Sequence, residues 1–203
     1  MKFRAFNIFA IICLIFAGCI KNPFSTRDTE DPYGASGTWE TPQSPEAALR
    51  NLLYAYNEMI MSNYELCFSD SFVFSSPEDS IDAVNSGREE LFIFWNKPTE
   101  IAVTSNIFNN FTQTDSLSLF LSLSHPAAYS DLVEDTMAIM YRNYVVAIIT
   151  STAMSSDTVL AEGLATFHLR PEQLNWWTIY FWDDLPKNSG FYDWGDFKAE
   201  YRR

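Results

Sequence analysis

The sequence predicts an α+β domain in which helices come first and mostly antiparallel strands follow. Apolar side chains recur with the period of a helix between residues 44 and 109, and with a period of two after Thr114. The composition, 47% apolar and 16% aromatic in 203 residues, supplies a core for one domain of about 160 residues. We therefore expect helices packed on one curved sheet.

The N-terminus carries the pattern of a secretory signal peptide. Lys2 and Arg4 form a basic start, Ile8 to Gly18 is almost purely apolar, and small residues precede Cys19. The run is shorter than the roughly 20 apolar residues that a transmembrane helix needs. We predict a signal peptide over residues 1–18.

The tetrad Phe16-Ala17-Gly18-Cys19 resembles the lipobox of bacterial lipoproteins. The resemblance implies that Cys19 is acylated and becomes the mature first residue, which would anchor the chain to the bacterial cell envelope. Because Ile20 rather than aspartate follows, it also implies the outer membrane, with the protein facing the periplasm. The alternative is ordinary secretion with a chance cysteine.

The formal charge of −13 limits the partners. An acidic surface repels phosphate backbones, so no nucleic acid is expected. It is not attracted to anionic lipid heads either, so membrane attachment must come from the acyl chains. Residues 19–43 are rich in Asn, Pro, Ser, Thr, Asp and Gly and predict a flexible tether. The folded domain is then expected to span residues 44–203.

The helical half begins with an N-cap serine, Ser44, followed by Pro45. One apolar face then predicts a helix to about Met61, formed by Leu49, Leu52, Leu53, Tyr56 and Ile60. Ser62-Asn63-Tyr64-Glu65 is a capping box that predicts a second, short helix ending near Phe68. A brief strand is expected at Phe72–Phe74.

The middle of the chain is expected to alternate between loop and helix. Pro77–Ser86 is polar and acidic and predicts a loop, and the capping box Ser86-Gly87-Arg88-Glu89 opens a helix from Arg88 to Trp95. Thr99–Asn109 is predicted as a helix, although its β-branched residues also suit a strand.

The second half of the sequence predicts β-strands. Leucines and serines alternate over residues 117–124, and long apolar or alternating segments follow at Met137–Thr150, Val159–Arg170 and Trp176–Asp184. Ser155-Ser156-Asp157 is expected to be the turn before the third of these strands. Trp194–Tyr201 is predicted as a closing helical turn or tail.

Several phrases resemble NTF2-like (SnoaL-like) domains of bacterial lipoproteins of unknown function. They are Phe68-Ser69-Asp70-Ser71-Phe72-Val73-Phe74, Trp177-Thr178-Ile179 with Trp182-Asp183-Asp184, and Asp193-Trp194-Gly195-Asp196-Phe197-Lys198. The resemblance covers roughly residues 44–200. It implies a cone in which a curved antiparallel sheet folds around helices, with a pocket between them.

Such a pocket would be lined by Tyr56, Trp95, Phe167 and Trp177, which suit an apolar or aromatic ligand. The alternative is that these side chains fill the core. Asp183 and Asp184 are the catalytic candidates, because a carboxylate in an apolar pocket can act as a general base. The alternative for both is a strand-end carboxylate that caps a turn or pairs with a basic residue.

The other reactive side chains favour structural roles. Cys67 lies between apolar neighbours and is expected to be a buried, inert thiol. His168 is expected to join a surface network with Arg170 and Glu162. His125 and His168 lie too far apart to form a metal motif, so neither a metal nor a cofactor is predicted.

Function can be narrowed to three hypotheses. The first is a lipid-anchored, non-enzymatic binding or assembly module for an apolar or aromatic small molecule or for an envelope protein, favoured because no family catalytic set can be placed on the chain. The second is a small acid–base enzyme, an isomerase, dehydratase or hydrolase, with Asp183 or Asp184 as base. The third is a subunit that forms a homodimer through an exposed sheet face.

Overall fold

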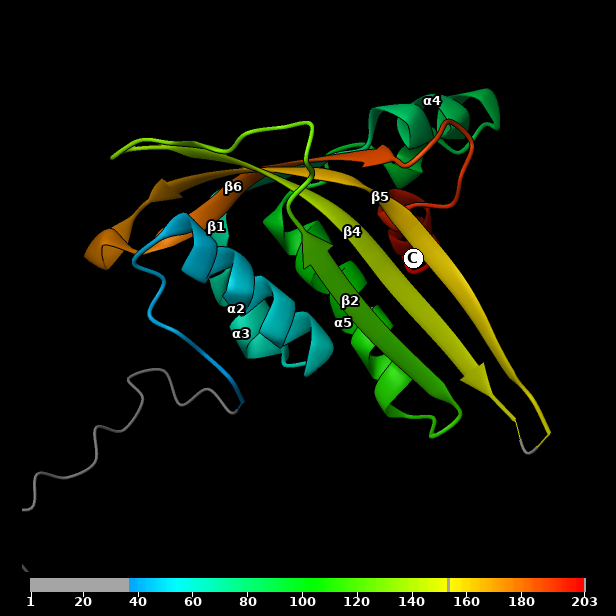
Figure 1. Ribbon diagram of the computed structural model, residues 1–203. Coiled ribbons are helices and arrows are strands. Elements are labelled where there is room, and N and C mark those ends of the chain that lie inside the picture. The colour runs from blue at the N-terminus through cyan, green and yellow to red at the C-terminus, as the bar shows by residue number, and fades with distance from the viewer. Residues whose placement is uncertain (1–36, 153, 203) are drawn as a thin grey trace, which may run out of the picture. The chain divides into compact units, whose positions relative to one another are not determined.

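A mixed sheet of six strands carries the fold (Figure 1). The computed structural model describes residues 37–152 and 154–202, so that Cys19, the predicted signal peptide and most of the predicted tether lie outside the described residues. The strand order is β1-β6-β5-β4-β2, with β3 paired to β4 off this path. The strands are β1 (Phe68–Ser75), β2 (Leu117–Ser124), β3 (Leu132–Val133), β4 (Ala138–Ser151), β5 (Ser156–Pro171) and β6 (Trp177–Pro186).

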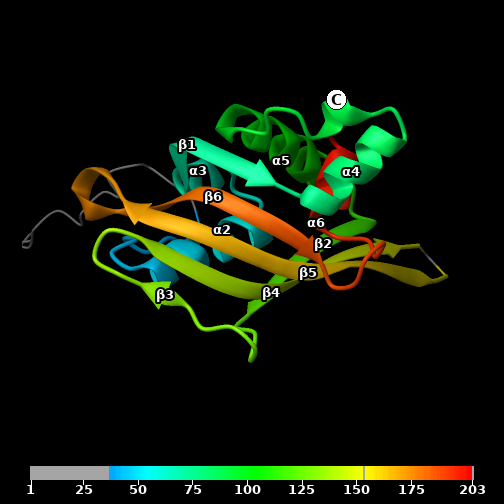
Figure 2. The ribbon, with the colours of Figure 1, turned by 90° about the horizontal axis from the view of Figure 1, so that it is seen from above.

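Helices α2, α3 and α5 lie against one face of this sheet (Figures 1 and 2), and the helix α6 closes the chain beside them. The helices are α2 (Pro45–Asn57), α3 (Met61–Leu66), α4 (Pro77–Asn85), α5 (Lys97–Thr112) and α6 (Trp194–Ala199), with single 3-10 turns at η1 (Glu89–Leu91) and η2 (Gln173–Asn175). Within the described part of the chain, every helix is too short or too polar to span a membrane.

The start of the first predicted helix is confirmed, but its end comes earlier. Ser44 is the N-cap of α2, and its Oγ accepts a hydrogen bond from the N–H of Ala47 at 3.2 Å. The helix ends at Asn57, and the chain turns at Met59, which has a φ of 55°. The predicted capping box is wrong: α3 starts one residue before Ser62, and its N-cap Ile60 has no side chain that can accept a hydrogen bond.

The segment after β1 corrects two further predictions. Pro77–Ser86, predicted as a loop, forms the helix α4, which begins with a proline and the acidic residues Glu78 and Asp79 in its first turn. The expected helix from Arg88 to Trp95 is only the 3-10 turn η1, and Phe94 beyond it has a φ of 55°, which no helix tolerates. The helix predicted at Thr99–Asn109 is confirmed within α5.

The strand predictions are confirmed, and their pairing adds one feature that the sequence did not predict. β4 pairs with β2 and β5, and β5 pairs with β6, all antiparallel. β1 instead pairs with β6 in parallel. The sheet is therefore mixed rather than wholly antiparallel.

A bulge in β6 changes which side chains face inward. His168 pairs with Phe181 and Leu169 pairs with Ile179, so that Tyr180 is the extra residue. Asp184 faces inward with Trp182, as alternation predicts, and both are fully buried. Strict alternation from Asp184 would place Ile179 on the opposite face, but Ile179 is fully buried as well, because the extra residue shifts the alternation before Trp182.

The last residues of the predicted tether belong to the folded unit. The N–H of Glu40 donates to Oδ1 of Asn51 at 2.8 Å, and Nδ2 of Asn51 donates back to the carbonyl of Glu40 at 2.7 Å. The carbonyl of Pro42 accepts from the N–H of Trp177 at 2.8 Å, so the segment is bonded to the start of β6. This attachment places the start of the folded unit before Ser44.

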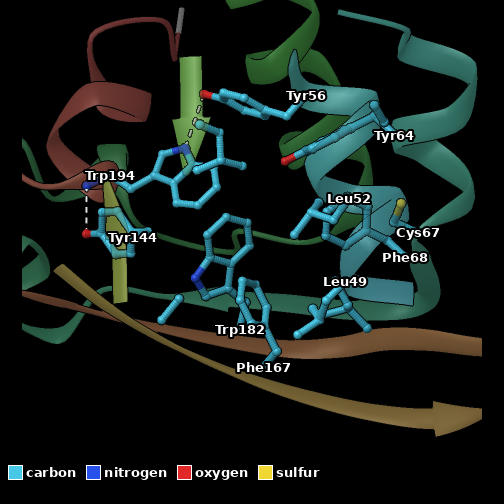
Figure 3. Packing of buried hydrophobic residues seen from close by; sticks show 14 of the residues in the cluster. Leu49, Leu52, Tyr56, Tyr64, Cys67, Phe68, Tyr144, Phe167, Trp182 and Trp194 are labelled. Atoms are coloured by element: carbon cyan, nitrogen blue, oxygen red, sulfur yellow. Dashed lines mark hydrogen bonds between the residues drawn. The ribbon is translucent and has the colours of Figure 1, made fainter. Parts of the chain in front are cut away.

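Large aromatic side chains fill the space between the helices and the sheet (Figure 3). The indoles of Trp182 and Trp194 meet edge to face with centroids 4.4 Å apart. Trp194 donates from Nε1 to the hydroxyl of Tyr56 at 3.2 Å and from its backbone N–H to the hydroxyl of Tyr144 at 3.0 Å. These bonds tie α6 to α2 and to β4, and they satisfy polar groups that burial would otherwise leave without partners.

Candidate functional site

Helix α6 carries charged side chains into two different environments. The first is a fully buried ion pair, in which Nζ of Lys198 lies 2.8 Å from Oε1 of Glu100 in α5, and neither side chain is exposed. Glu100 also accepts from the hydroxyl of Tyr64 at 2.6 Å and from Nε1 of Trp95 at 2.7 Å. Each carboxylate oxygen of Glu100 thus has a donor, as a buried charge requires.

Aromatic rings surround the ammonium group of Lys198. Its Nζ lies 3.6 Å from the ring centroid of Trp182 and 4.0 Å from that of Phe74, a cation–π arrangement. Burial lowers the pKa of Lys198, whereas Glu100 and Asp184 favour its charged form. The charges of Lys198 and Glu100 compensate each other, although Nζ of Lys198 makes no hydrogen bond of good geometry within the described residues, and their complete burial indicates a structural role.

Asp184 lies near this pair, close to the C-terminal end of β6. It is fully buried, and its Oδ2 accepts from the backbone N–H of Gly195 at 2.9 Å. Burial raises the pKa of Asp184 to about 7, and Lys198 opposes this shift. The carboxyl group fixes the start of α6.

The second environment is a cluster of three aspartates, Asp79 in α4 and Asp193 and Asp196 at the start of α6. One carboxylate oxygen from each lies within 4.8 Å of one from each of the others. Asp193 is the N-cap of α6, and its Oδ1 accepts from the N–H of Asp196 at 2.9 Å. Ser76 donates from Oγ to Oδ2 of Asp79 at 2.6 Å.

A glycine allows these carboxylates to come close together. Gly195 has no side chain where a Cβ would collide with Oδ2 of Asp79, so α4 and α6 approach closely. Burial and the neighbouring carboxylates raise the pKa of Asp79 to about 8 and that of Asp193 to about 7. In the described part of the chain, no lysine or arginine forms an ion pair with any of the three.

An open cavity of about 260 Å³ leads to this cluster between α4, η1 and α6. Its charged lining consists of four carboxylates against one guanidinium, which belong to Asp79, Asp82, Asp196, Glu200 and Arg88. Arg202 holds the wall formed by η1, donating to the carbonyls of Leu91 and Ile93 at 2.6 Å each. We call this the acidic cavity.

The aromatic residues predicted to line a pocket lie in the core. Tyr56, Trp95, Phe167 and Trp177 are all buried and belong to one hydrophobic cluster. None of them lines the acidic cavity or the three other surface cavities described for this chain. A ligand-binding role for them stays a prediction.

The remaining predicted residues do not come together as a site. Asp183 is half-buried on the face of β6 opposite Asp184. Arg170 pairs with Glu172 at 3.0 Å and Glu162 with Lys187 at 3.0 Å, so these two side chains do not form one network with His168. Burial lowers the pKa of His168, with Asp183 acting in the opposite direction.

Cys67 is buried as predicted. Its thiol donates to the carbonyl of Asn63 at 3.3 Å, and burial raises its pKa, which disfavours the reactive thiolate.

The sequence reasoning missed the acidic cluster and the buried ion pair. Asp193, Asp196 and Lys198 stand in the phrase that carries the resemblance, but Asp79 lies in the segment predicted as a loop. A proline followed by two acidic residues was the available signal for a helix there.

No protein-family model and no curated protein matches the sequence. Solved structures do: a protein from Kribbella flavida has a TM-score of 0.51 at 7% identity, covering 75% of this chain and 92% of that one. A conserved protein from Planctomyces limnophilus has a TM-score of 0.50 at 13% identity, with 70% and 93% covered. An NTF2-like superfamily protein from Salmonella enterica has a TM-score of 0.47 at 11% identity, with 71% and 89% covered.

At these identities the likeness concerns the fold alone. The architecture of the chain itself, N-terminal helices on a mixed and mostly antiparallel six-stranded sheet, is the α+β layout that the sequence predicts.

Proposed function

We propose that this chain is a lipid-anchored, non-enzymatic binding module of the bacterial cell envelope, and that its ligand presents a cationic group to the acidic cavity. The anchoring half rests on the lipobox-like tetrad before Cys19, and the location at the outer membrane rests on Ile20 after it. The binding half rests on one observation, an open cavity in which four carboxylates face a single guanidinium.

The geometry of Asp184 favours binding over acid–base catalysis. A general base must reach the proton of a substrate within hydrogen-bonding distance. Asp184 is fully buried, bonded to Gly195 and surrounded by packed aromatic side chains. Asp183 projects from the opposite face of the sheet, so the two candidates for the enzyme hypothesis do not share a cavity.

The charge of the acidic cavity narrows the chemistry of the ligand. A concentration of carboxylates attracts cations and repels anions, and the low dielectric of the partly buried floor strengthens this attraction. The cavity therefore favours an ammonium, a guanidinium or a metal ion over the apolar ligand that the aromatic residues suggested.

The anchor is tested with Cys19→Ser. Wild-type protein should label with a palmitate analogue and sediment with membranes, whereas Cys19→Ser should lose the label and leave the membrane fraction. The proposal of an anchor is wrong if the variant still takes up the label.

The cavity is tested with spermidine as an organic polycation, added to the purified full-length protein in detergent at matched ionic strength. Spermidine should raise the melting temperature of the wild type, and Asp82→Asn, which removes an exposed charge from the cavity lining, should reduce that shift. The matched control is Asp115→Asn, an equal change of charge at an exposed site between α5 and β2. Equal shifts in all three proteins would contradict a cationic ligand in the cavity.

A further inference from the structure

The acidic cluster holds a buried acceptor without a donor. Asp193 is fully buried, and only its Oδ1 is occupied, by the N–H of Asp196. Its Oδ2 accepts no hydrogen bond from any residue in the described part of the chain. A buried carboxylate oxygen without a donor costs free energy, so such an atom in a folded protein calls for a further partner.

The carboxyl group of Asp79 strengthens the case for a further partner of Asp193. Carboxylate oxygens of Asp79 and Asp193 lie within 4.8 Å of each other, and both side chains are buried. Carboxylates have acceptors only, so two that lie this close call for a proton or a cation between them. Asp196 adds a third carboxylate to the same group, and the acidic cavity reaches Asp79 and Asp196 from solvent.

We propose that Asp79, Asp193 and Asp196 bind one hard divalent cation, Ca²⁺ or Mg²⁺, which enters through the acidic cavity. This inference rests on the proposed function and names the cation that the cavity takes. The three residues offer oxygen atoms only, which hard cations prefer and which soft or borderline metals do not require. Asp82 and Glu200, which line the same cavity, add negative charge along the path of entry.

A cation would also remove the electrostatic cost of the cluster. Three carboxylates whose oxygen atoms lie within 4.8 Å of one another repel each other when they are ionised. A divalent ion reverses this effect, because it favours the ionised form of every carboxylate that it contacts.

The test uses full-length protein in detergent, freed of metal with a chelator. Tb³⁺ serves as a luminescent substitute for Ca²⁺, because Trp194 and Tyr192 flank Asp193 in the chain and can transfer excitation to an ion in the cluster. We expect luminescence that saturates at one Tb³⁺ per chain and is displaced by Ca²⁺. Calorimetry with Ca²⁺ and with Mg²⁺ then gives the affinity of each.

The decisive variant is Asp196→Asn. Asp196 is only half-buried, and its backbone N–H rather than its carboxylate bonds to Asp193, so this change should leave α6 intact. It should weaken cation binding at least about tenfold, since even outer-shell partners of a metal change its affinity by about 10–100-fold. Asp79→Asn should do the same, and Asp115→Asn should bind like the wild type.

The inference is overturned if no saturable binding occurs, or if Asp196→Asn and Asp115→Asn bind the cation equally well. In that case the cluster shares a proton only. If spermidine still shifts the melting temperature in a manner that depends on Asp82, the proposed function stands without the metal site. If neither spermidine nor a divalent cation binds, both proposals fail.

Discussion

The two groups of charged side chains at α6 differ in how their buried charges are compensated. Around Lys198, the carboxylate of Glu100 and aromatic rings compensate one cation. Two side-chain donors satisfy that carboxylate, and all of these groups lie in the closed core. Around Asp193, three carboxylates meet next to an open cavity, and one buried oxygen lacks a donor. The difference teaches that burial alone does not mark a functional site. A charge whose partners lie in the core stabilises the fold, and a charge that lacks them and adjoins solvent is available to a ligand.

The largest expected effect comes from breaking the compensated pair. Lys198→Met keeps the apolar stem but leaves Glu100 as a buried charge without its cation, which should lower the free energy of unfolding by about 3–5 kcal/mol. The double variant Glu100→Gln with Lys198→Met should recover part of this loss, because residue 100 then carries no buried charge. Denaturant unfolding measures both, and a loss below about 1 kcal/mol for Lys198→Met would show that the pair does not stabilise the fold.

The contrast between the two regions also explains what the sequence could predict. Local periodicity predicted α2, α5, β2 and β5, because each places one apolar face on the core. It failed for α4, whose buried residues are few and include an aspartate. That helix is specified by its start at Pro77 and by contacts distant in the chain.

The charged regions could not be predicted, because they arise from tertiary contacts. Glu100 and Lys198 come from different helices, and the strands β2 to β6 separate Asp79 from Asp193 along the chain. The parallel pairing of β1 with β6 and the bulge at Tyr180 also depend on contacts between residues that are far apart in the chain. Asp184 was singled out as a candidate general base, but no sequence pattern reveals that the backbone N–H of Gly195 would donate to its carboxylate.

The pH dependence of stability tests the uncompensated cluster most directly. The pKa of Asp79 is raised to about 8 in the folded protein, where Ser76, Asp193 and Asp196 face it, from an ordinary value of 3.8. Over this window the folded state retains a proton that the unfolded state has lost. The contribution of Asp79 to stability is therefore full below about pH 4 and falls as the pH rises toward about 8.

The decisive measurement is the free energy of unfolding of wild type and Asp79→Asn, with a chelator present, at about pH 4 and about pH 9. Asparagine keeps an acceptor for Ser76 and removes the charge. The account predicts similar stabilities near pH 4 and a variant that is more stable than the wild type by about 1–3 kcal/mol near pH 9. The rise in the pKa of Asp79 from 3.8 to about 8 sets an upper bound of about 6 kcal/mol, at about 1.4 kcal/mol per pKa unit, and screening by solvent in the open cavity lowers the effect. A variant less stable than the wild type near pH 9 would contradict the claim that this cluster lacks its cation.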